Sequence, residues 1–326
     1  MKKLLFVAIL AFCSAAYADP QPVPGTPFDR YVTPDTLGRQ IAFYVSKSGS
    51  ERLPLALIIQ GSGCWSVFTQ HSAGQISGWH QNTLFSIAAN RFRVMIVEKP
   101  GVGFLDDPIN PGTAENCTDE FKKGHTLERW MEALKASVLA ARNQLNIDTT
   151  RMLVAGHSEG GISSAKFAAD NSFVTHAAIL SGSGPNQLFE LTAITRKSNQ
   201  NLPENEREAA VDQIFQDYKQ ILSEPNNWTK LMWGHPYLRW TSFLATSTLQ
   251  ELKRSNAKIF LAHGTEDLSV PIESFDLNRA EMLRMARDVV ADRREGAPHN
   301  LNKPGQNGPE GMREVLTAVA NWFMSN

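Results

Sequence analysis

The sequence predicts an α/β protein with a mostly parallel central sheet that helices cover on both faces. Two observations support this class. Short, continuous apolar runs alternate with helical stretches, and each run has the length and character of a strand buried on both faces. Alternation of strands and helices favours parallel strands joined by crossover helices. The expected strands are 55–59, 94–97, 152–155, 177–180 and 259–262.

Three segments outside these strands have the composition or spacing of helices. Apolar residues between Leu127 and Leu145 recur every three or four positions, which predicts a helix of about five turns. Residues 162–169 are small and compatible with a helix, and residues 310–324 place their apolar side chains on one side. We therefore expect helices at all three segments.

The segment 186–250 interrupts the alternation of strands and helices. It has no strand pattern, several prolines punctuate it, and it contains Trp228, Trp233 and Trp240. This pattern predicts a mostly helical insertion that lies over the edge of the sheet as a cap. A pair of ordinary connecting helices agrees equally well with the sequence.

Residues 1–18 have the three parts of a secretory signal peptide. Two lysines precede a short apolar run, and the small residues Ala16 and Ala18 occupy the positions that a signal peptidase recognises. The run is too short to favour a membrane anchor, and Phe12 disfavours a lipoprotein attached through Cys13. We expect cleavage after Ala18 and a secreted or periplasmic protein.

The mature chain would have 308 residues (326 − 18). We expect residues 19–36 to form an extended lead-in and residues 37–326 a single domain. Loss of the two lysines would change the formal net charge from −1 to −3, and no basic block is present, so nucleic acid is not an expected partner. No second long apolar run indicates a membrane span, and nothing in the pattern specifies an oligomeric state.

Only Cys64 and Cys117 would remain after cleavage. Two cysteines in an exported protein usually pair, so we expect a disulfide. In the chain-entropy description, closing this loop stabilises the fold by about 4 kcal/mol. Two unpaired buried thiols are the alternative.

The strongest chemical motif is Gly156-His157-Ser158-Glu159-Gly160. It directly follows the expected strand 152–155 and precedes a helical stretch, which is the setting of a nucleophile elbow. The glycines let neighbouring backbone pass close to a strained turn. The turn would present Ser158 as a nucleophile at the start of a helix.

A serine nucleophile needs a base, and the base needs an acid that orients it. Asp267 follows the expected strand 259–262 and is the predicted acid, with Glu266 as the alternative. His299 is the only histidine after Asp267, so it is the predicted base. No spacing among the other histidines indicates a metal site.

The loop Gln60-Gly61-Ser62-Gly63-Cys64 follows another expected strand. We expect the backbone N–H groups of Ser62 and Glu159 to form an oxyanion hole, with Gly63 as the next candidate. A disulfide at Cys64 would hold this loop in place. The side chain of Glu159 would either attract a cationic substrate group or face water.

The glycine loop, the elbow, the run His263-Gly-x-x-Asp267-x-x-Val-Pro271 and the late His299 resemble the α/β-hydrolase superfamily. The resemblance extends from about residue 40 to the end of the chain. The elbow is similar to those of some prolyl-oligopeptidase-like and acyl-hydrolase members. Gln60 departs from the histidine that many members have, which weakens assignment to a named lipase group.

The resemblance implies a serine hydrolase, an esterase or acyl hydrolase rather than a peptidase, that forms an acyl-serine intermediate. The expected partner is a small-molecule acyl substrate, and no cofactor or metal is required. An acyltransferase with the same triad and a non-catalytic binding protein with the same fold are the alternatives.

Overall fold

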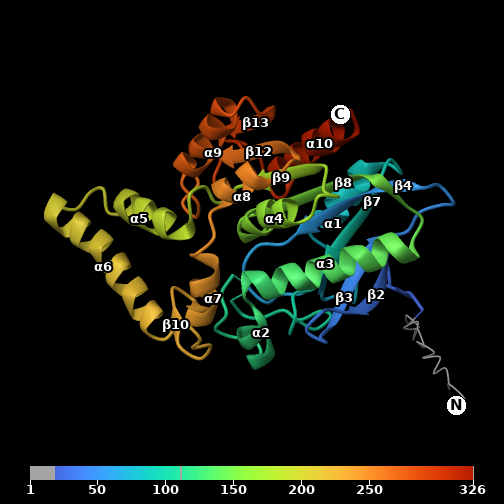
Figure 1. Cartoon of the computed structure of the whole chain (residues 1–326), viewed down its shortest axis with the longest axis horizontal. Helices are drawn as coiled ribbons and strands as arrows, with labels where there is room; N and C mark the ends of the chain where they lie inside the picture. Colours follow the sequence, from blue (N-terminus) through green and yellow to red (C-terminus); the bar gives the residue numbers. More distant parts are fainter. Residues whose placement is uncertain (1–18, 111, 326) are drawn as a thin grey trace, which may run out of the picture.

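The computed structural model describes residues 19–110 and 112–325, so the signal peptide predicted for residues 1–18 lies outside the described part. Within it, the main sheet has nine strands (Figure 1). In spatial order they are β1 (Gln21–Pro22), β2 (Phe28–Pro34), β3 (Gln40–Ser46), β7 (Arg93–Val97), β4 (Leu53–Ile59), β8 (Ile147–His157), β9 (His176–Leu180), β12 (Lys258–Gly264) and β13 (Val289–Arg294).

The five predicted strands are confirmed as the parallel centre of the sheet. They lie within β7, β4, β8, β9 and β12, and every neighbouring pair among them is parallel. β13 extends this parallel set by pairing with β12. The mostly parallel α/β class is therefore confirmed.

The amino-terminal edge of the sheet is antiparallel. β1 pairs with β2, β2 with β3, and β3 with β7. β1 and β2 lie within residues 19–36, which we expected only to be an extended lead-in. The sheet thus begins at residue 21, ahead of the domain boundary expected at residue 37.

Helices cover both faces of the sheet. One face carries α3 (Leu127–Gln144), α4 (Glu159–Asp170), α8 (Thr248–Arg254) and α9 (Ile272–Arg284), and the other carries α1 (His80–Ala88) and α10 (Glu310–Ser325). Side chains of β4 alternate between the two cores: Leu55 and Leu57 pack with α3, whereas Ala56 and Ile58 pack with α1 and α10. The three predicted helices are confirmed as α3, α4 and α10.

The segment 186–250 is mostly helical. It contains α5 (Gln187–Ser198), α6 (Glu204–Ser223), a short hairpin of β10 (Leu231–Met232) and β11 (His235–Pro236), and α7 (Tyr237–Phe243). α5 and α6 lie to one side of the sheet (left in Figure 1). A small apolar cluster that includes Ile221 and Trp240 holds the segment together. The segment therefore contains more than two connecting helices.

Two smaller elements lie near the glycine loop. A hairpin of β5 (Phe68–Gln70) and β6 (Ile76–Gly78) follows the loop, and α2 (Asp119–Gly124) precedes α3. None of the helices in the described residues is long and apolar enough to cross a membrane. Because β4, β8 and β12 are parallel, the loops that follow them meet at one edge of the sheet, where open α/β sheets bind ligands.

Candidate active site

Ser158 lies between β8 and α4, at the N-cap of the helix. Its backbone has φ 59° and ψ −125°, a conformation that costs energy for a residue with a side chain. The turn is held by hydrogen bonds from the Ser158 N–H to the carbonyl oxygen of Leu180 (2.9 Å) and from the Gly161 N–H to that of Ser158 (2.8 Å). The strained turn presents the serine at the carboxyl end of the sheet.

Two glycines make this turn sterically possible. A Cβ atom at Gly156 would lie 1.9 Å from the carbonyl oxygen of Gly160, and a Cβ at Gly160 would lie 2.2 Å from that of Ile59. No side chain can be accommodated at such distances. The geometry therefore explains both glycines of the motif by close backbone approach.

Asp267 and His299 form a hydrogen-bonded pair. His299 Nδ1 lies 2.7 Å from Asp267 Oδ2, and the carboxylate is buried. The other oxygen, Oδ1, accepts the backbone N–H groups of Ser269 (2.7 Å) and Val270 (2.9 Å). Burial raises the pKa of Asp267, but the hydrogen bond and charge of His299 outweigh it and lower the pKa. The acid is thus ionised and oriented toward the imidazole.

Glu266, the alternative acid, lies elsewhere. Its side chain is largely exposed and faces Lys197 at 3.8 Å. Of the two adjacent carboxylates, only Asp267 is in contact with His299.

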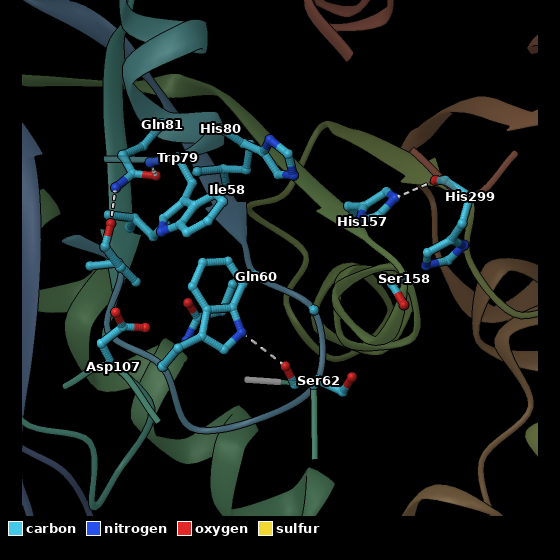
Figure 2. A pocket seen from close by; sticks show the side chains of 15 residues that line it. Ile58, Gln60, Ser62, Trp79, His80, Gln81, Asp107, His157, Ser158 and His299 are labelled. Atoms are coloured by element: carbon cyan, nitrogen blue, oxygen red, sulfur yellow. Dashed lines mark hydrogen bonds between the residues drawn. The ribbon is translucent and has the colours of Figure 1, made fainter. Parts of the chain in front are cut away.

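Ser158 and His299 border the same two cavities. Figure 2 shows the first, with Ser158, His157 and His299 on one side and Trp79 and His80 opposite. This cavity has a volume of about 370 Å³ and mainly apolar walls. The second has about 330 Å³, and the segment 186–250 contributes much of its lining, including Leu191, Trp233, Arg239 and Trp240.

The predicted oxyanion loop lies against the nucleophile. A Cβ built on Gly61 would be 3.4 Å from Ser158 Cβ, so the loop passes within van der Waals contact. Ser62 lines both cavities together with Ser158. Glu159 is the first residue of α4, where the helix leaves the backbone N–H without an internal acceptor. Both expected donors thus lie beside Ser158.

The predicted pairing of the cysteines is present in the structure. Cys64 and Cys117 form a disulfide with their Cα atoms 5.7 Å apart, which links the oxyanion loop to the segment before α2.

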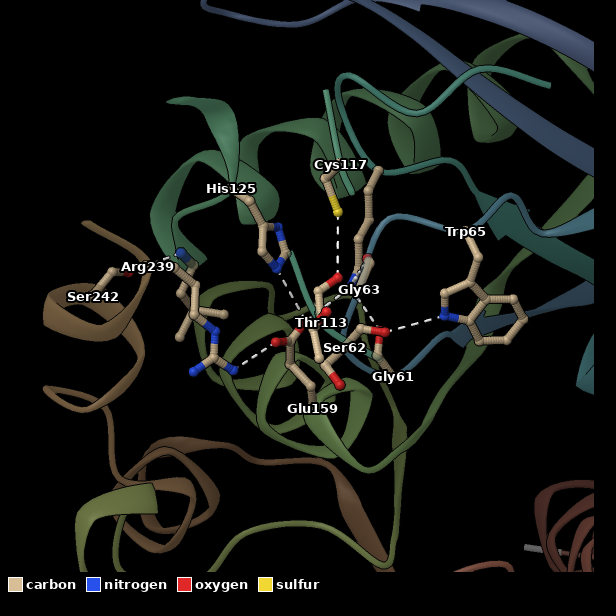
Figure 3. A network of polar contacts seen from close by, with 12 residues as sticks. Gly61, Ser62, Gly63, Trp65, Thr113, Cys117, His125, Glu159, Arg239 and Ser242 are labelled. Atoms are coloured by element: carbon tan, nitrogen blue, oxygen red, sulfur yellow. Dashed lines mark hydrogen bonds and ion pairs between the residues drawn. The ribbon is translucent and has the colours of Figure 1, made fainter. Parts of the chain in front are cut away.

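We expected the side chain of Glu159 either to attract a cationic substrate group or to face water, and the structure shows neither arrangement. It is buried, and its carboxylate contacts Lys99 (2.8 Å), Arg239 (2.6 Å) and His125 (3.1 Å), the last two of which appear in Figure 3. Burial opposes ionisation of Glu159, but these partners hold its pKa well below the usual value. Two buried cations from distant segments satisfy the carboxylate, which the local motif could not reveal.

His157, the residue before the predicted nucleophile, contacts the loop that carries the predicted base. Its Nε2 donates to the carbonyl oxygen of His299 (2.8 Å), as Figure 2 shows, and Ser181 Oγ donates to the same oxygen (3.1 Å). Burial lowers the pKa of His157 to about 3, so the ring is neutral. These two bonds fix the loop that carries His299. Within the described residues, no three His, Cys, Asp or Glu side chains gather as a metal site requires.

No protein-family model and no curated protein matches the sequence. Solved structures do match. The uncomplexed acylaminoacyl peptidase of Pyrococcus horikoshii is 13% identical with a TM-score of 0.60, covering 92% of this chain and 41% of the peptidase. An esterase of Pyrococcus furiosus is 14% identical with a TM-score of 0.56, covering 91% of each chain.

The fold is that of the α/β-hydrolases. Est1E from Butyrivibrio proteoclasticus agrees, with 16% identity, a TM-score of 0.55, and coverage of 91% of this chain and 99% of that protein. This chain spans about two fifths of the length of the acylaminoacyl peptidases it matches. In the α/β-hydrolase fold of this chain, the elbow after β8 and the loops after β4, β12 and β13 meet at one site.

Proposed function

We propose that the protein is an exported serine hydrolase that cleaves a carboxylic ester, thioester or amide through an acyl-Ser158 intermediate. One observation carries the proposal: the 2.7 Å bond between Asp267 and His299, with His299 lining the same cavities as the strained serine. A histidine held by a buried carboxylate, beside a half-buried serine that borders a cavity, is the arrangement that nucleophilic acyl transfer needs.

The reaction would follow from this geometry. Asp267 accepts a hydrogen bond from Nδ1–H of His299, which leaves the lone pair of Nε2 free to accept the proton of Ser158 as Oγ attacks the carbonyl carbon. The N–H groups of Ser62 and Glu159 stabilise the negative oxygen of the tetrahedral intermediate. Its collapse breaks the bond to the leaving group, which receives the proton from His299. Water then transfers a proton to His299 and attacks the carbonyl carbon of the acyl group. The second tetrahedral intermediate collapses by breaking the bond to Ser158 Oγ, which takes the proton back from His299.

The dimensions of the two cavities favour a small acyl substrate. Volumes of about 370 and 330 Å³ lie at the lower end of ordinary ligand pockets. The first cavity has an apolar wall that suits a hydrocarbon group. Its apolar lining residues include Ile58, Trp65, Val67, Trp79 and Ile96. We therefore propose an esterase or acyl hydrolase rather than a peptidase, with the segment 186–250 capping the second cavity.

A panel of p-nitrophenyl esters, thioesters and aminoacyl amides tests this function on the purified protein. We expect the highest kcat/KM for esters with apolar acyl groups, and we expect a fluorophosphonate probe to modify Ser158, located by mass spectrometry. Absence of turnover across the panel together with labelling at another serine would overturn the proposal. Amino-terminal sequencing of the exported protein should begin at Asp19.

A further inference from the structure

Lys99 lies two residues beyond the end of β7, and its ammonium group is completely buried. It donates to three acceptors: the carbonyl oxygen of Gly61 (2.6 Å), that of Gly63 (3.2 Å) and Oε1 of Glu159 (2.8 Å). An ammonium group has three N–H donors, so all of them are used. Two of the three bonds reach the oxyanion loop, and the third reaches the residue that follows the nucleophile.

The bond to Gly61 fixes the direction of the Ser62 N–H. The carbonyl of Gly61 and the N–H of Ser62 belong to one planar trans peptide unit, so they point in opposite directions. With the oxygen held by Lys99, the N–H must point away from the buried ammonium. Gly61 lies in contact with Ser158 on that loop, so the orientation of this single peptide decides whether an oxyanion at the serine finds its donor.

The third bond reaches the other half of the oxyanion hole. Glu159 supplies its backbone N–H at the start of α4, while its side chain accepts from Lys99 and Arg239. The same ammonium therefore connects the loop after β4 to the helix after β8.

We propose that Lys99, bound to the carboxylate of Glu159, is a positioning residue that orients the two backbone donors of the oxyanion hole. The inference rests on the serine-hydrolase function proposed above. Lys99 lines neither of the two cavities that border Ser158. Lys99 acts through the peptide units of the loop, and Glu159 holds the ammonium at the correct place between them.

The electrostatic setting agrees with a positioning role. The cluster contains two cations, Lys99 and Arg239, and one anion, Glu159, while burial lowers the pKa of His125 to about 4 and keeps that ring neutral. Burying such a group of charges contributes little to stability compared with apolar side chains of the same volume. An apolar side chain in place of Lys99 could not donate directional hydrogen bonds to the two carbonyl oxygens of the loop.

The substitution Lys99→Met tests the proposal because it keeps an unbranched side chain only one atom shorter and removes all three donors. Loss of one oxyanion donor costs about 100-fold or more in rate. A donor that keeps the correct orientation part of the time should reduce the rate by a smaller factor than a missing donor. We therefore expect kcat to fall about 10- to 100-fold. KM should change little, because the donor acts on the transition state. Binding of a trifluoromethyl ketone, which forms a tetrahedral adduct, should weaken by the same factor.

Arg93→Met is the matched control. Arg93 is a buried cation at the other end of β7, where it donates to the carbonyl oxygen of Ser46 (3.0 and 2.8 Å). This variant loses a buried charge at the start of β7 and should keep the wild-type kcat and ketone affinity. If Lys99→Met does not fold, the double variant Lys99→Met/Glu159→Gln removes one charge of each sign and keeps both backbone donors.

The outcomes separate the two proposals. If the wild type neither hydrolyses an ester nor reacts with a fluorophosphonate, the serine-hydrolase function fails. If the wild type and Arg93→Met are active, and a folded variant without Lys99 keeps its kcat and its affinity for the ketone, only the positioning role fails. A fall in kcat without weaker ketone binding would also overturn it.

Discussion

The substitution Asp267→Asn tests the roles of the acid and the base together. In the wild type, Oδ1 of Asp267 accepts the N–H groups of Ser269 and Val270, while Oδ2 accepts Nδ1–H of His299. Asparagine has the same shape, so the fold should remain intact. The two backbone donors require its oxygen at the Oδ1 position, which directs the amide NH₂ toward His299.

An NH₂ group can only donate to His299 Nδ1. The ring must then carry its proton on Nε2, the atom that has to accept the proton of Ser158. The wrong tautomer costs about 10⁴-fold in rate in a comparable triad, equivalent to about 5 kcal/mol of transition-state stabilisation. We therefore expect kcat/KM to fall about 10⁴-fold, measured with a short p-nitrophenyl ester.

Glu266→Gln is the matched control, because it makes the same chemical change in the adjacent, exposed carboxylate. It should retain nearly full activity. Both variants should have melting temperatures close to that of the wild type. If Asp267→Asn keeps activity within tenfold of the wild type, or if Glu266→Gln is the inactive variant, the reasoning from orientation is refuted.

Three further predictions concern the nucleophile, the disulfide and a buried acid. Ser158→Ala should abolish turnover and fluorophosphonate labelling while near-UV circular dichroism stays unchanged; residual turnover above the buffer rate would exclude Ser158 as nucleophile. Reduction of Cys64–Cys117 should lower the free energy of unfolding by up to about 4 kcal/mol, yet lower kcat less than Lys99→Met does. An equal or larger loss of kcat would mean that the bridge, not Lys99, orients the loop. Burial raises the pKa of Glu98 to about 8, above its unfolded value, so the native state binds this proton more tightly. Glu98 therefore stabilises the native state at low pH, and this contribution, on the order of a few kcal/mol, is lost as pH rises toward 8. The free energy of unfolding, measured with urea at pH 5 and pH 9, should differ less between the two pH values for Glu98→Gln than for the wild type. An equal difference in both proteins would refute the raised pKa of Glu98.

Local sequence predicted the parts of the site that depend on local backbone geometry. The elbow needs glycine where an added Cβ would lie 1.9 Å (Gly156) or 2.2 Å (Gly160) from a backbone oxygen, and this requirement is visible in the motif itself. The order of Ser158, Asp267 and His299 along the chain follows from which loops meet at one edge of a parallel sheet.

The partners of Glu159 left no comparable signal. Lys99 follows β7, His125 ends α2 and Arg239 belongs to α7, so only the fold brings them together. A charged residue two positions after a buried strand was the one available indication for Lys99. Without these partners, the carboxylate was expected either to attract a cationic substrate group or to face water, and the structure corrects both interpretations.

The antiparallel edge was also missed, for a different reason. β2 mixes buried residues such as Phe28 and Tyr31 with the charged residues Asp29 and Arg30. Its pattern is neither continuously apolar nor strictly alternating. β2 has a full-length neighbour on one side only, because the two-residue β1 pairs with it just at Asp29 and Arg30, and its composition is correspondingly less constrained.

Arg239 gives the segment 186–250 a role that a lid alone would not have. Its guanidinium lies 4.1 Å from the ring centroids of both Trp240 and Phe243, and from there it reaches the carboxylate of Glu159. The segment is therefore not interchangeable with another helical insertion of similar length. A chimera that exchanged it to alter substrate preference would remove a counter-charge from beneath the nucleophile. Any such transplant must bring its own arginine, or catalysis and specificity will change together.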